Sequence, residues 1–300
     1  HFEDERAAYC KKWFDENCGA GAYIDGAKNV IFPYNVSESS PLFVLCAHTD
    51  TVFPDMTEPM PYSTDGRIAR SPGVGDDTIC LVMMLMVAKY IIKNNIPSKR
   101  GVLFVANAGE EGLGNLKGVK QIMADYAGRI QRLYTFDGTY DHMYTRCVGS
   151  HRYKIGIETK GGHSFSDFGN RNAICAAAEL ICALNNCQVP VDGNSKTTFN
   201  VGLIEGGTSV NTIAQHAEML YEFRSDNKED LAEMEAHLDA ALAFYATKGI
   251  KVTSTVVGYR PCGIEIDKAR HEALINRCKA ITKNHFGFEP TTGPASTDCN

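Results

Sequence analysis

The stretch Val102-Leu-Phe-Val-Ala-Asn-Ala-Gly-Glu-Glu-Gly112 begins as a run of apolar residues and ends in two adjacent carboxylates between glycines. Such a short apolar run is typical of a strand that is buried on both faces of a sheet. Adjacent side chains on an extended segment point in opposite directions, so Glu110 and Glu111 are able to serve different groups. A Glu-Glu pair by itself is more often a solvated acidic turn, because glutamates are mostly exposed. The interpretation therefore depends on how the other strands end.

Three other segments end in the same way. An apolar run leads to His48 and Asp50, a glycine-containing loop presents Asp76 and Asp77, and a further apolar segment stops at Asp137. Open α/β sheets bind their ligands at the carboxyl ends of the strands, so these side chains are expected to converge there. An imidazole with several carboxylates and no thiolate suits zinc, and also manganese or cobalt.

Such a set of residues predicts metal-assisted hydrolysis. In the minimal form, one carboxylate bridges two metal ions and the water between them is the nucleophile. A carboxylate that is not a ligand must then take the proton of that water and pass it to the leaving group. Glu110 and Glu111 offer this division of labour, although the residues do not identify the bond that is cleaved.

Composition excludes several other classes of protein. A net charge of -6 over 300 residues argues against a nucleic-acid-binding surface. The apolar stretch 79–92 is too short to cross a membrane and is typical of a buried helix. Eleven cysteines occur without a C-x-x-C pair, and several lie in apolar segments, as Cys46, Cys80, Cys175 and Cys182 do. We therefore expect reduced thiols and a cytoplasmic protein.

The order of the predicted elements indicates two domains. Strands and helices alternate to about residue 147, which predicts an α/β domain of three layers around a mostly parallel sheet. Residues 148–261 instead follow the order β-α-β-β-α-β, a split βαβ, ferredoxin-like arrangement. The elements expected there are strand 152–159, helix 173–184, strands 198–204 and 218–224, helix 229–245 and strand 252–257. Residues 262–300 are expected to return to the first domain, including a helix over 267–285, with the C-terminal part of that domain truncated.

Five short motifs in order resemble the co-catalytic zinc exopeptidases, a family that includes peptidase T, carboxypeptidase G, aminoacylase and acetylornithine deacetylase. They are His48-Thr-Asp50, Gly75-Asp-Asp77, Gly109-Glu-Glu-Gly112, Asp137 and Gly162-His-Ser164. Each motif alone is weak, but their order covers nearly the whole chain. The resemblance implies a catalytic domain with an inserted lid and dimerisation domain at 148–261, and a homodimer formed through that insert.

The resemblance also implies a ligand set for two divalent metal ions, zinc in the first place, with cobalt or manganese as alternatives. His48 and Asp137 would bind one ion and Glu111 the other, with Asp76 as the bridge. The peptide bond between Asp76 and Asp77 resembles the cis bond of the family.

The remaining roles are carried over in the same way. Asp50 would orient the imidazole ligand, and Glu110 would be the general base. His163 matches a residue of the inserted domain that stabilises the oxyanion in the partner subunit's active site. Asn211 and Arg224 resemble residues that hold the carboxylate of the substrate. Without the resemblance, these last three would be read as surface or turn residues.

Two departures from the family pattern affect the expected site. Thr78-Ile79 stands where the family often has Lys-Gly after the bridging region, which alters the surroundings of that ligand. The family's last ligand is a histidine beyond a segment similar to Ser296-Thr-Asp298, where this sequence stops. His271 and His285 lie on or just after the preceding helix and are not expected to replace it. We therefore expect the second metal site to be incomplete, with one firmly bound ion and little hydrolysis.

The reaction expected from the resemblance is the removal of an N-terminal residue from a short peptide. An aspartate at position 137 is similar to the aminopeptidases and dipeptidases, and the stretches 161–170 and 206–212 look most like peptidase T-like members. One alternative is an N-acyl amino acid deacylase or a carboxypeptidase of the same family. A second is a homologue that binds peptides or metal without catalysis, although binding alone has no need of a proton shuttle such as Glu110.

Overall fold

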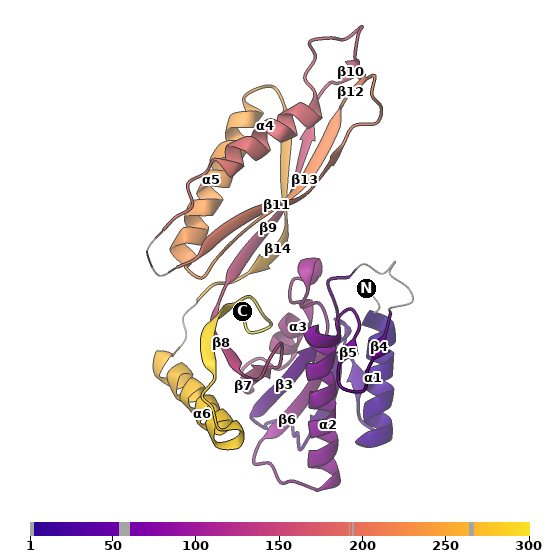
Figure 1. Ribbon diagram of the computed structural model, residues 1–300, viewed down its shortest axis with the longest axis vertical. Coiled ribbons are helices and arrows are strands. Elements are labelled where there is room, and N and C mark those ends of the chain that lie inside the picture. Colours follow the sequence, from indigo (N-terminus) through magenta and orange to yellow (C-terminus); the bar gives the residue numbers. More distant parts are fainter. Residues whose placement is uncertain (1–2, 54–60, 192, 194, 264–266) are drawn as a thin grey trace. The chain divides into compact units, whose positions relative to one another are not determined.

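A computed structural model describes residues 3–53, 61–191, 193, 195–263 and 267–300 of the chain. The chain divides into two compact units, which we describe separately. Unit 1 comprises His1–His142 together with Thr297–Cys299, and unit 2 comprises Met143–Ser296 together with Asn300. Figure 1 shows the ribbon of both units and labels their helices and strands where there is room.

A five-stranded sheet of order β1-β2-β6-β3-β7 forms the centre of unit 1. Strands β6, β3 and β7 run parallel to one another, whereas β2 and β1 are added antiparallel at the other edge. The strands are β1 Tyr23–Ile24, β2 Val30–Tyr34, β3 Leu42–His48, β6 Gly101–Asn107 and β7 Ile130–Thr135. The parallel part therefore consists of the strands whose ends carry the predicted site residues.

Helices cover both faces of this sheet, as a three-layer α/β domain requires. Helices α1 (Glu3–Asn17) and α2 (Ile79–Lys93) pack on one face, and α3 (Lys117–Asp125) packs on the other. Side chains of β6 alternate between the two cores, with Phe104 in the first and Leu103 in the second. Because both faces are buried, the strand is apolar throughout rather than alternating.

The other described elements of unit 1 are short. They are β4 Ser63–Thr64, β5 Ala69–Arg70, the turn η1 Val74–Thr78 and the turn η2 Gly112–Gly114. The turn η1 leads directly into α2, and η2 follows the two glutamates after β6. Both turns therefore lie beside the carboxyl ends of the parallel strands.

Unit 2 contains the predicted split βαβ arrangement. Its four-stranded sheet has the order β11-β13-β9-β14 and is antiparallel throughout, with α4 and α5 on one face (Figure 1). The elements are β9 Gly149–Glu158, α4 Ala173–Asn185, β11 Thr197–Gly206, β13 His216–Ser225, α5 Lys228–Ala246 and β14 Lys251–Arg260. The side chains of Asn172 and Asn227 cap the two helices by accepting backbone N–H groups of the first turn.

Two further strand pairs form sheets of their own. Strand β10 (Gly162–His163) pairs with β12 (Thr212–Ile213), and β8 (His142–Cys147) pairs with β15 (Thr291–Ala295). Helix α6 (Lys268–Phe286) precedes β15. In the division into compact units, residues 262–296 belong to unit 2, whereas the sequence interpretation assigns residues 262–300 to the catalytic domain. The functional division into a catalytic domain of residues 1–147 and 262–300 and an inserted domain of residues 148–261 stays a prediction.

The cysteines and the apolar helix α2 follow the sequence expectations only in part, since one side of α2, with Met83 and Met86, is exposed rather than buried. All eleven cysteines are free thiols, and Cys46 and Cys80 are buried as expected. Cys175 and Cys182 are exposed instead, because they lie on the side of α4 away from the core. Within the described ranges, no helix has the length and hydropathy needed to cross a membrane.

Candidate metal centre

Parallel strands bring the first predicted residues to one edge of the sheet of unit 1. Strands β3 and β6 pair in parallel register, so that His48, the last residue of β3, lies beside Asn107, the last residue of β6. The backbone carbonyl of Asn107 accepts both the N–H and the hydroxyl of Thr49, at 2.8 and 2.9 Å. These bonds hold the two strand ends together where the chain leaves the sheet.

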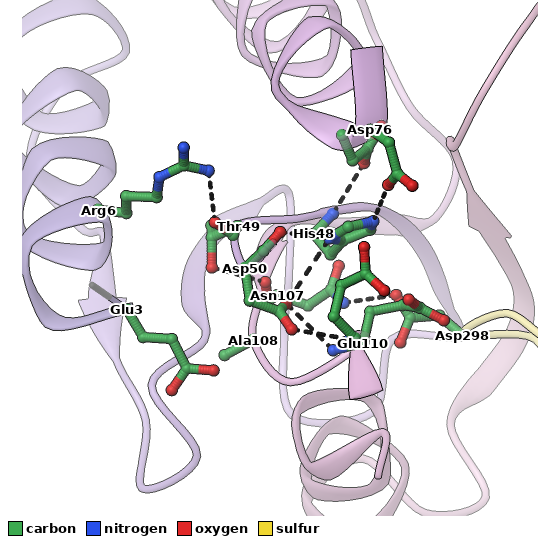
Figure 2. Close-up of polar contacts among 12 residues, drawn as sticks. Glu3, Arg6, His48, Thr49, Asp50, Asp76, Asn107, Ala108, Glu110 and Asp298 are labelled. Atoms are coloured by element: carbon green, nitrogen blue, oxygen red, sulfur yellow. Dashed lines mark hydrogen bonds and ion pairs between the residues drawn. The ribbon is translucent and has the colours of Figure 1, made fainter. Parts of the chain in front are cut away.

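The imidazole of His48 is buried and has an acidic partner on each nitrogen (Figure 2). Nε2 lies 3.0 Å from Oδ1 of Asp76. Nδ1 lies 3.0 Å from the backbone carbonyl oxygen of Asp50 and 3.6 Å from the Oδ1 atom of that residue. Burial alone lowers the pKa of His48, but hydrogen bonds to Asp50 and Asp76 and the charge of Asp77 raise it to about 12. Without a metal ion, His48 is therefore protonated; an ion bound by Nε2 and Asp76 would replace that proton.

Two groups of side chains have the composition and spacing to hold a cation. The ligand atoms of His48, Asp76 and Asp137 lie within 4.8 Å of one another. The ligand atoms of His48, Glu110 and Glu111 form a second group, also within 4.8 Å of one another. The structure therefore brings together all four predicted ligands, with the predicted base beside them. Their individual roles stay predictions.

The carboxylates of this centre repel one another in the absence of a cation. Burial, then the charges of Asp76 and Glu110, raise the pKa of Glu111 to about 7. Burial and the charge of Asp76 likewise raise the pKa of Asp137, and the positive charge of His48 offsets only part of this. A divalent cation would relieve this repulsion, so the donor set fits a metal ion of the kind that imidazole and carboxylate ligands select.

Asp50 connects the histidine to the two glutamates. Its carboxylate accepts the backbone N–H of Glu110 at 3.1 Å and that of Glu111 at 2.8 Å. The atom of Asp50 in direct contact with His48 is the backbone carbonyl rather than the carboxylate. Orientation of the imidazole by Asp50 stays a prediction, with the carbonyl as the nearer partner.

Three buried residues of the site, Asp77, Asn107 and Asp298, were given no functional role in the sequence interpretation. Asp77 accepts the backbone N–H of His48 at 3.0 Å, and burial together with the charge of Asp137 raises its pKa to about 7. Asn107 donates a hydrogen bond of 2.6 Å to Asp298, which is 2% exposed (Figure 2).

Burial and the charge of Glu110 raise the pKa of Asp298 to about 7. The only sequence signal for Asp298 was the resemblance of the segment Ser296-Thr-Asp298, since its burial depends on the fold. The peptide bond between Asp76 and Asp77 is cis, as the resemblance implied.

The structure separates the predicted residues of unit 2 into two places. His163 on β10 pairs with Thr212, and the carbonyl of Asn211 accepts the N–H of Ser164 at 2.9 Å, so His163 and Asn211 are neighbours. Arg224 lies near the far end of β13, a strand of 10 residues that begins at His216, close to the β10–β12 strand pair. Ten strand residues span roughly 30 Å. One copy of unit 2 therefore does not bring Arg224 to the other two.

Hydrogen bonds determine which nitrogen of the exposed His163 ring is available. Its Nδ1 accepts the backbone N–H groups of Phe165 and Ser166, at 3.3 and 3.4 Å. The proton of the neutral ring is therefore on Nε2, which is a donor. The backbone N–H of His163 donates to Asp167 at 2.8 Å and fixes the turn.

Two family models match the chain, and both matches agree with a metallopeptidase site at the sheet edge described above. A family model described as peptidase dimerisation domain matches residues 147–249, and the model of peptidase family M28 matches residues 29–158. Neither match alone covers half of the chain; together they run from residue 29 to residue 249 and support the co-catalytic metallopeptidases as its family. The match to the dimerisation domain of this family falls on the insert predicted from sequence, and the second match contains His48, Asp76, Glu110, Glu111 and Asp137.

One curated relative matches a little under half of this chain. An N-acetyldiaminopimelate deacetylase of Bacillus pumilus (strain SAFR-032) is 27% identical over 152 residues, which is 45% of this chain and 39% of that protein. The match thus spans well under half of the length of that relative.

Three solved structures share the fold over almost the whole chain. A tripeptidase of Staphylococcus aureus is similar with a TM-score of 0.71 and 22% identity, over 97% of this chain and 79% of that chain. The aminopeptidase PepT of Bacillus cereus has a TM-score of 0.67 and 21% identity, over 100% and 81%. A dinuclear metal-binding peptidase of Bacillus subtilis from the M20 family has a TM-score of 0.62 and 17% identity, over 99% and 79%. At these identities the similarity establishes the fold.

Proposed function

We propose that this protein is a metal-dependent exopeptidase that removes the N-terminal residue of short peptides. The observation that carries the proposal is the convergence of His48, Asp76 and Asp137 within one ligand-sized group, with Glu110 and Glu111 in a second group around the same histidine. The tripeptidase and PepT structures with the same fold support a peptide as the substrate.

The reaction divides the work between the two glutamates. The metal ions, when bound, lower the pKa of a water molecule and polarise the scissile carbonyl. Glu110 takes the proton from that water and delivers it to the leaving amine. Glu111 binds metal, and the N–H groups that both glutamates donate to Asp50 hold their backbone in place. His163, with its proton on Nε2, stabilises the oxyanion.

We infer that two divalent ions are bound in the complete site, with zinc as the first candidate and cobalt or manganese as alternatives. The imidazole and carboxylate donors are compatible with all three. The dinuclear metal-binding peptidase of the same fold supports the number two. Zinc itself is our prediction from the ligand types.

We further propose that the protein is a homodimer formed through residues 148–261. The match to the peptidase dimerisation domain supports this, and β11 offers an edge of the sheet for pairing. A dimer also gives a reason why His163 on β10 and Arg224 near the end of β13 lie far apart within unit 2, since residues of two subunits would complete one site. The eleven free thiols favour the cytoplasm as the compartment.

The test of the activity is a substrate screen with the 300-residue chain. Tripeptides and N-acetyl amino acids are incubated with added zinc, cobalt or manganese, and the released amine is measured. Preferred release of the N-terminal residue from tripeptides supports the proposal. Preferred cleavage of N-acetyl amino acids would favour the deacylase alternative, which the similarity to the deacetylase supports. Metal binding without cleavage of either class would favour the non-catalytic homologue.

A further inference from the structure

A cysteine and a histidine of unit 2, neither of them among the predicted catalytic residues, are in direct contact. Cys187 lies two residues beyond the end of α4, and His237 lies in the middle of α5, the helix that packs beside α4 (Figure 1). The Sγ atom of Cys187 is 2.8 Å from Nδ1 of His237. The backbone N–H of Cys187 donates to the carbonyl of Leu184 at 3.2 Å, which anchors the thiol to the last turn of α4. The packing of the two helices therefore holds a sulfur and an imidazole nitrogen face to face.

Both side chains of this pair reach solvent. Cys187 and His237 are half-buried, whereas Leu180 of α4 and Leu238 of α5 are covered completely by the core of unit 2. Cys187 packs against that core without being enclosed by it. An ion in solution can therefore reach the sulfur and the nitrogen without any displacement of the helices.

A carboxylate lies next to the pair on the same side of α5. Residues four positions apart are neighbours on a helix surface, so Glu233 is one turn away from His237. The side chain of Glu233 is exposed, and its charge, after the effect of burial, contributes to raising the pKa of Cys187. One turn in the other direction, positions 240 and 241 are alanines and offer no ligand atom. Glu233 is therefore the carboxylate of α5 that is placed to join the pair.

The spacing of sulfur and nitrogen is close to that required by one metal ion. Zinc binds thiolate sulfur at about 2.3 Å and imidazole nitrogen at about 2.0–2.1 Å. In tetrahedral geometry these bond lengths place the two donor atoms roughly 3.6 Å apart. The observed 2.8 Å thus has to open by roughly 0.8 Å, which a small rotation of either side chain provides.

We propose that Cys187, His237 and Glu233 form a zinc-binding site, with a water molecule as the fourth ligand. Zinc accepts thiolate, imidazole and carboxylate donors, and a tetrahedral ion with three protein ligands keeps one position for water. On binding, the ion takes the place of the thiol proton, which is released to solvent. The negative charge of Glu233, which favours the protonated thiol, also attracts a divalent cation to the same place.

The proposed site has two physical consequences. A bound ion joins the end of α4 to the middle of α5, so zinc should stabilise the folded chain against unfolding. Competition from the thiol proton and the open fourth position make binding weaker than in a closed site of four protein ligands, so dialysis should remove this ion. The affinity for zinc should rise between pH 6 and pH 8, because fewer thiols are then protonated.

The experiment titrates the metal-free full chain with cobalt, which substitutes for zinc, and records the near-ultraviolet absorption. A charge-transfer band from sulfur to cobalt requires a thiolate ligand, and the ligands predicted for the metal centre of unit 1 include none. We expect such a band in the unchanged chain and its loss when zinc displaces the cobalt. Cys187→Ser should abolish the band. His237→Gln should raise the cobalt concentration at half-saturation at least about tenfold, and Glu233→Gln should raise it by a smaller factor.

Cys182→Ser is the matched control. Cys182 is an exposed thiol of α4, five residues before Cys187, and its substitution should leave the band unchanged. Alkylation by iodoacetamide provides a second measurement on the unchanged chain: zinc should slow the modification of Cys187 at least tenfold and leave that of Cys182 unaffected, as measured by mass spectrometry of peptides.

Several results would overturn the inference. They are the absence of a band, a band that zinc does not displace, a band that survives in C187S or disappears in C182S, an unchanged affinity in H237Q or E233Q, and equal protection of the two thiols by zinc. The alkylation measurement needs no variant, so the proposal stays testable even where a substitution prevents folding. Both readouts depend on a thiolate and are independent of hydrolysis.

Discussion

The carboxylate of Asp50 accepts the backbone N–H of Glu111 at 2.8 Å, which ties the chain after β3 to the loop after β6. The same carboxylate also accepts the N–H of Glu110. One buried side chain therefore holds the backbone of both glutamates in place and lies beside His48. This relationship explains how a loop between glycines, Gly109 and Gly112, presents two carboxylates in a defined geometry.

The first prediction concerns Asp50→Asn. An amide offers one acceptor in place of two, so one of the two N–H groups loses its partner, and we expect a loss of about 1–3 kcal/mol in the free energy of unfolding at pH 7. Burial raises the pKa of Asp50, but His48 and the N–H groups of the glutamates lower it on balance. The stabilisation by this carboxylate is therefore present above pH 4 or so and is lost as the pH falls further. Urea unfolding between pH 7 and pH 4 should show a constant deficit; a deficit that grows with acid would contradict the assignment.

The second prediction separates the roles of the two glutamates. Glu110→Gln should reduce turnover by roughly 10²–10⁴-fold while the metal content stays near that of the unchanged chain, because a positioned base is lost and no ligand is. Glu111→Gln, the matched variant one residue away, should need a higher concentration of added zinc to fill the second site. Turnover and metal content by elemental analysis are measured together. If the first variant lost metal and the second kept it, the two roles would be reversed.

The third prediction concerns the buried Asp298. Its pKa is raised to about 7, so the folded chain binds its proton more tightly than the unfolded chain does. Stability from this group is therefore fully present below about pH 4 and is lost as the pH rises to about 7.

Asp298→Asn imitates the protonated form. In the metal-free chain, it should exceed the unchanged chain in the free energy of unfolding at pH 8 by at least about 1.4 kcal/mol, the value of one pKa unit. The difference should shrink at pH 5. Urea unfolding at pH 5 and pH 8 checks this. Equal free energies of unfolding for the two chains at pH 8 would show that ionisation of Asp298 does not destabilise the folded chain.

The fourth prediction concerns metal stoichiometry. His48, Asp76 and Asp137 supply three donors to one site, whereas the second site has Glu111 and the shared Asp76 as its predicted ligands. Two carboxylates without an imidazole hold first-row metals weakly, so we expect one firmly bound ion per chain after dialysis, whereas added metal fills the second site in the activity assays. His48→Ala should abolish this binding. Two tightly bound zinc ions per chain would mean that a further residue is a ligand.

The fifth prediction concerns the dimer. Sedimentation should show a dimer of the 300-residue chain at micromolar concentration. If His163 acts across subunits, mixing inactive His163→Ala and Glu110→Gln chains should restore part of the activity, since one of the two sites in each mixed dimer then has both residues. His216→Ala, an exposed histidine of the same unit that lies beside Glu218, is the control and should retain activity. A monomer at all concentrations would remove both claims.

Much of the fold was predictable from local patterns. The continuous apolar runs of β3 and β6 and the change to alternation at β9 correctly separated a sheet covered on both faces from a sheet covered on one. Polar residues directly after strands identified His48, Glu110, Glu111 and Asp137 as neighbours, because parallel strands end at one edge. These inferences succeeded because periodicity depends only on residues close in sequence.

The tertiary structure alone decided the features that depend on residues far apart in sequence. The contact of Asp298 with Asn107, 191 positions away, and the choice of the Asp50 carbonyl as the partner of His48 required the packed strand ends. The pairing of Arg152 with Glu222 required the register of β9 against β13. Burial, pKa values and hydrogen-bond partners arise from which segments exclude water from one another, and a sequence pattern specifies that only for its nearest neighbours.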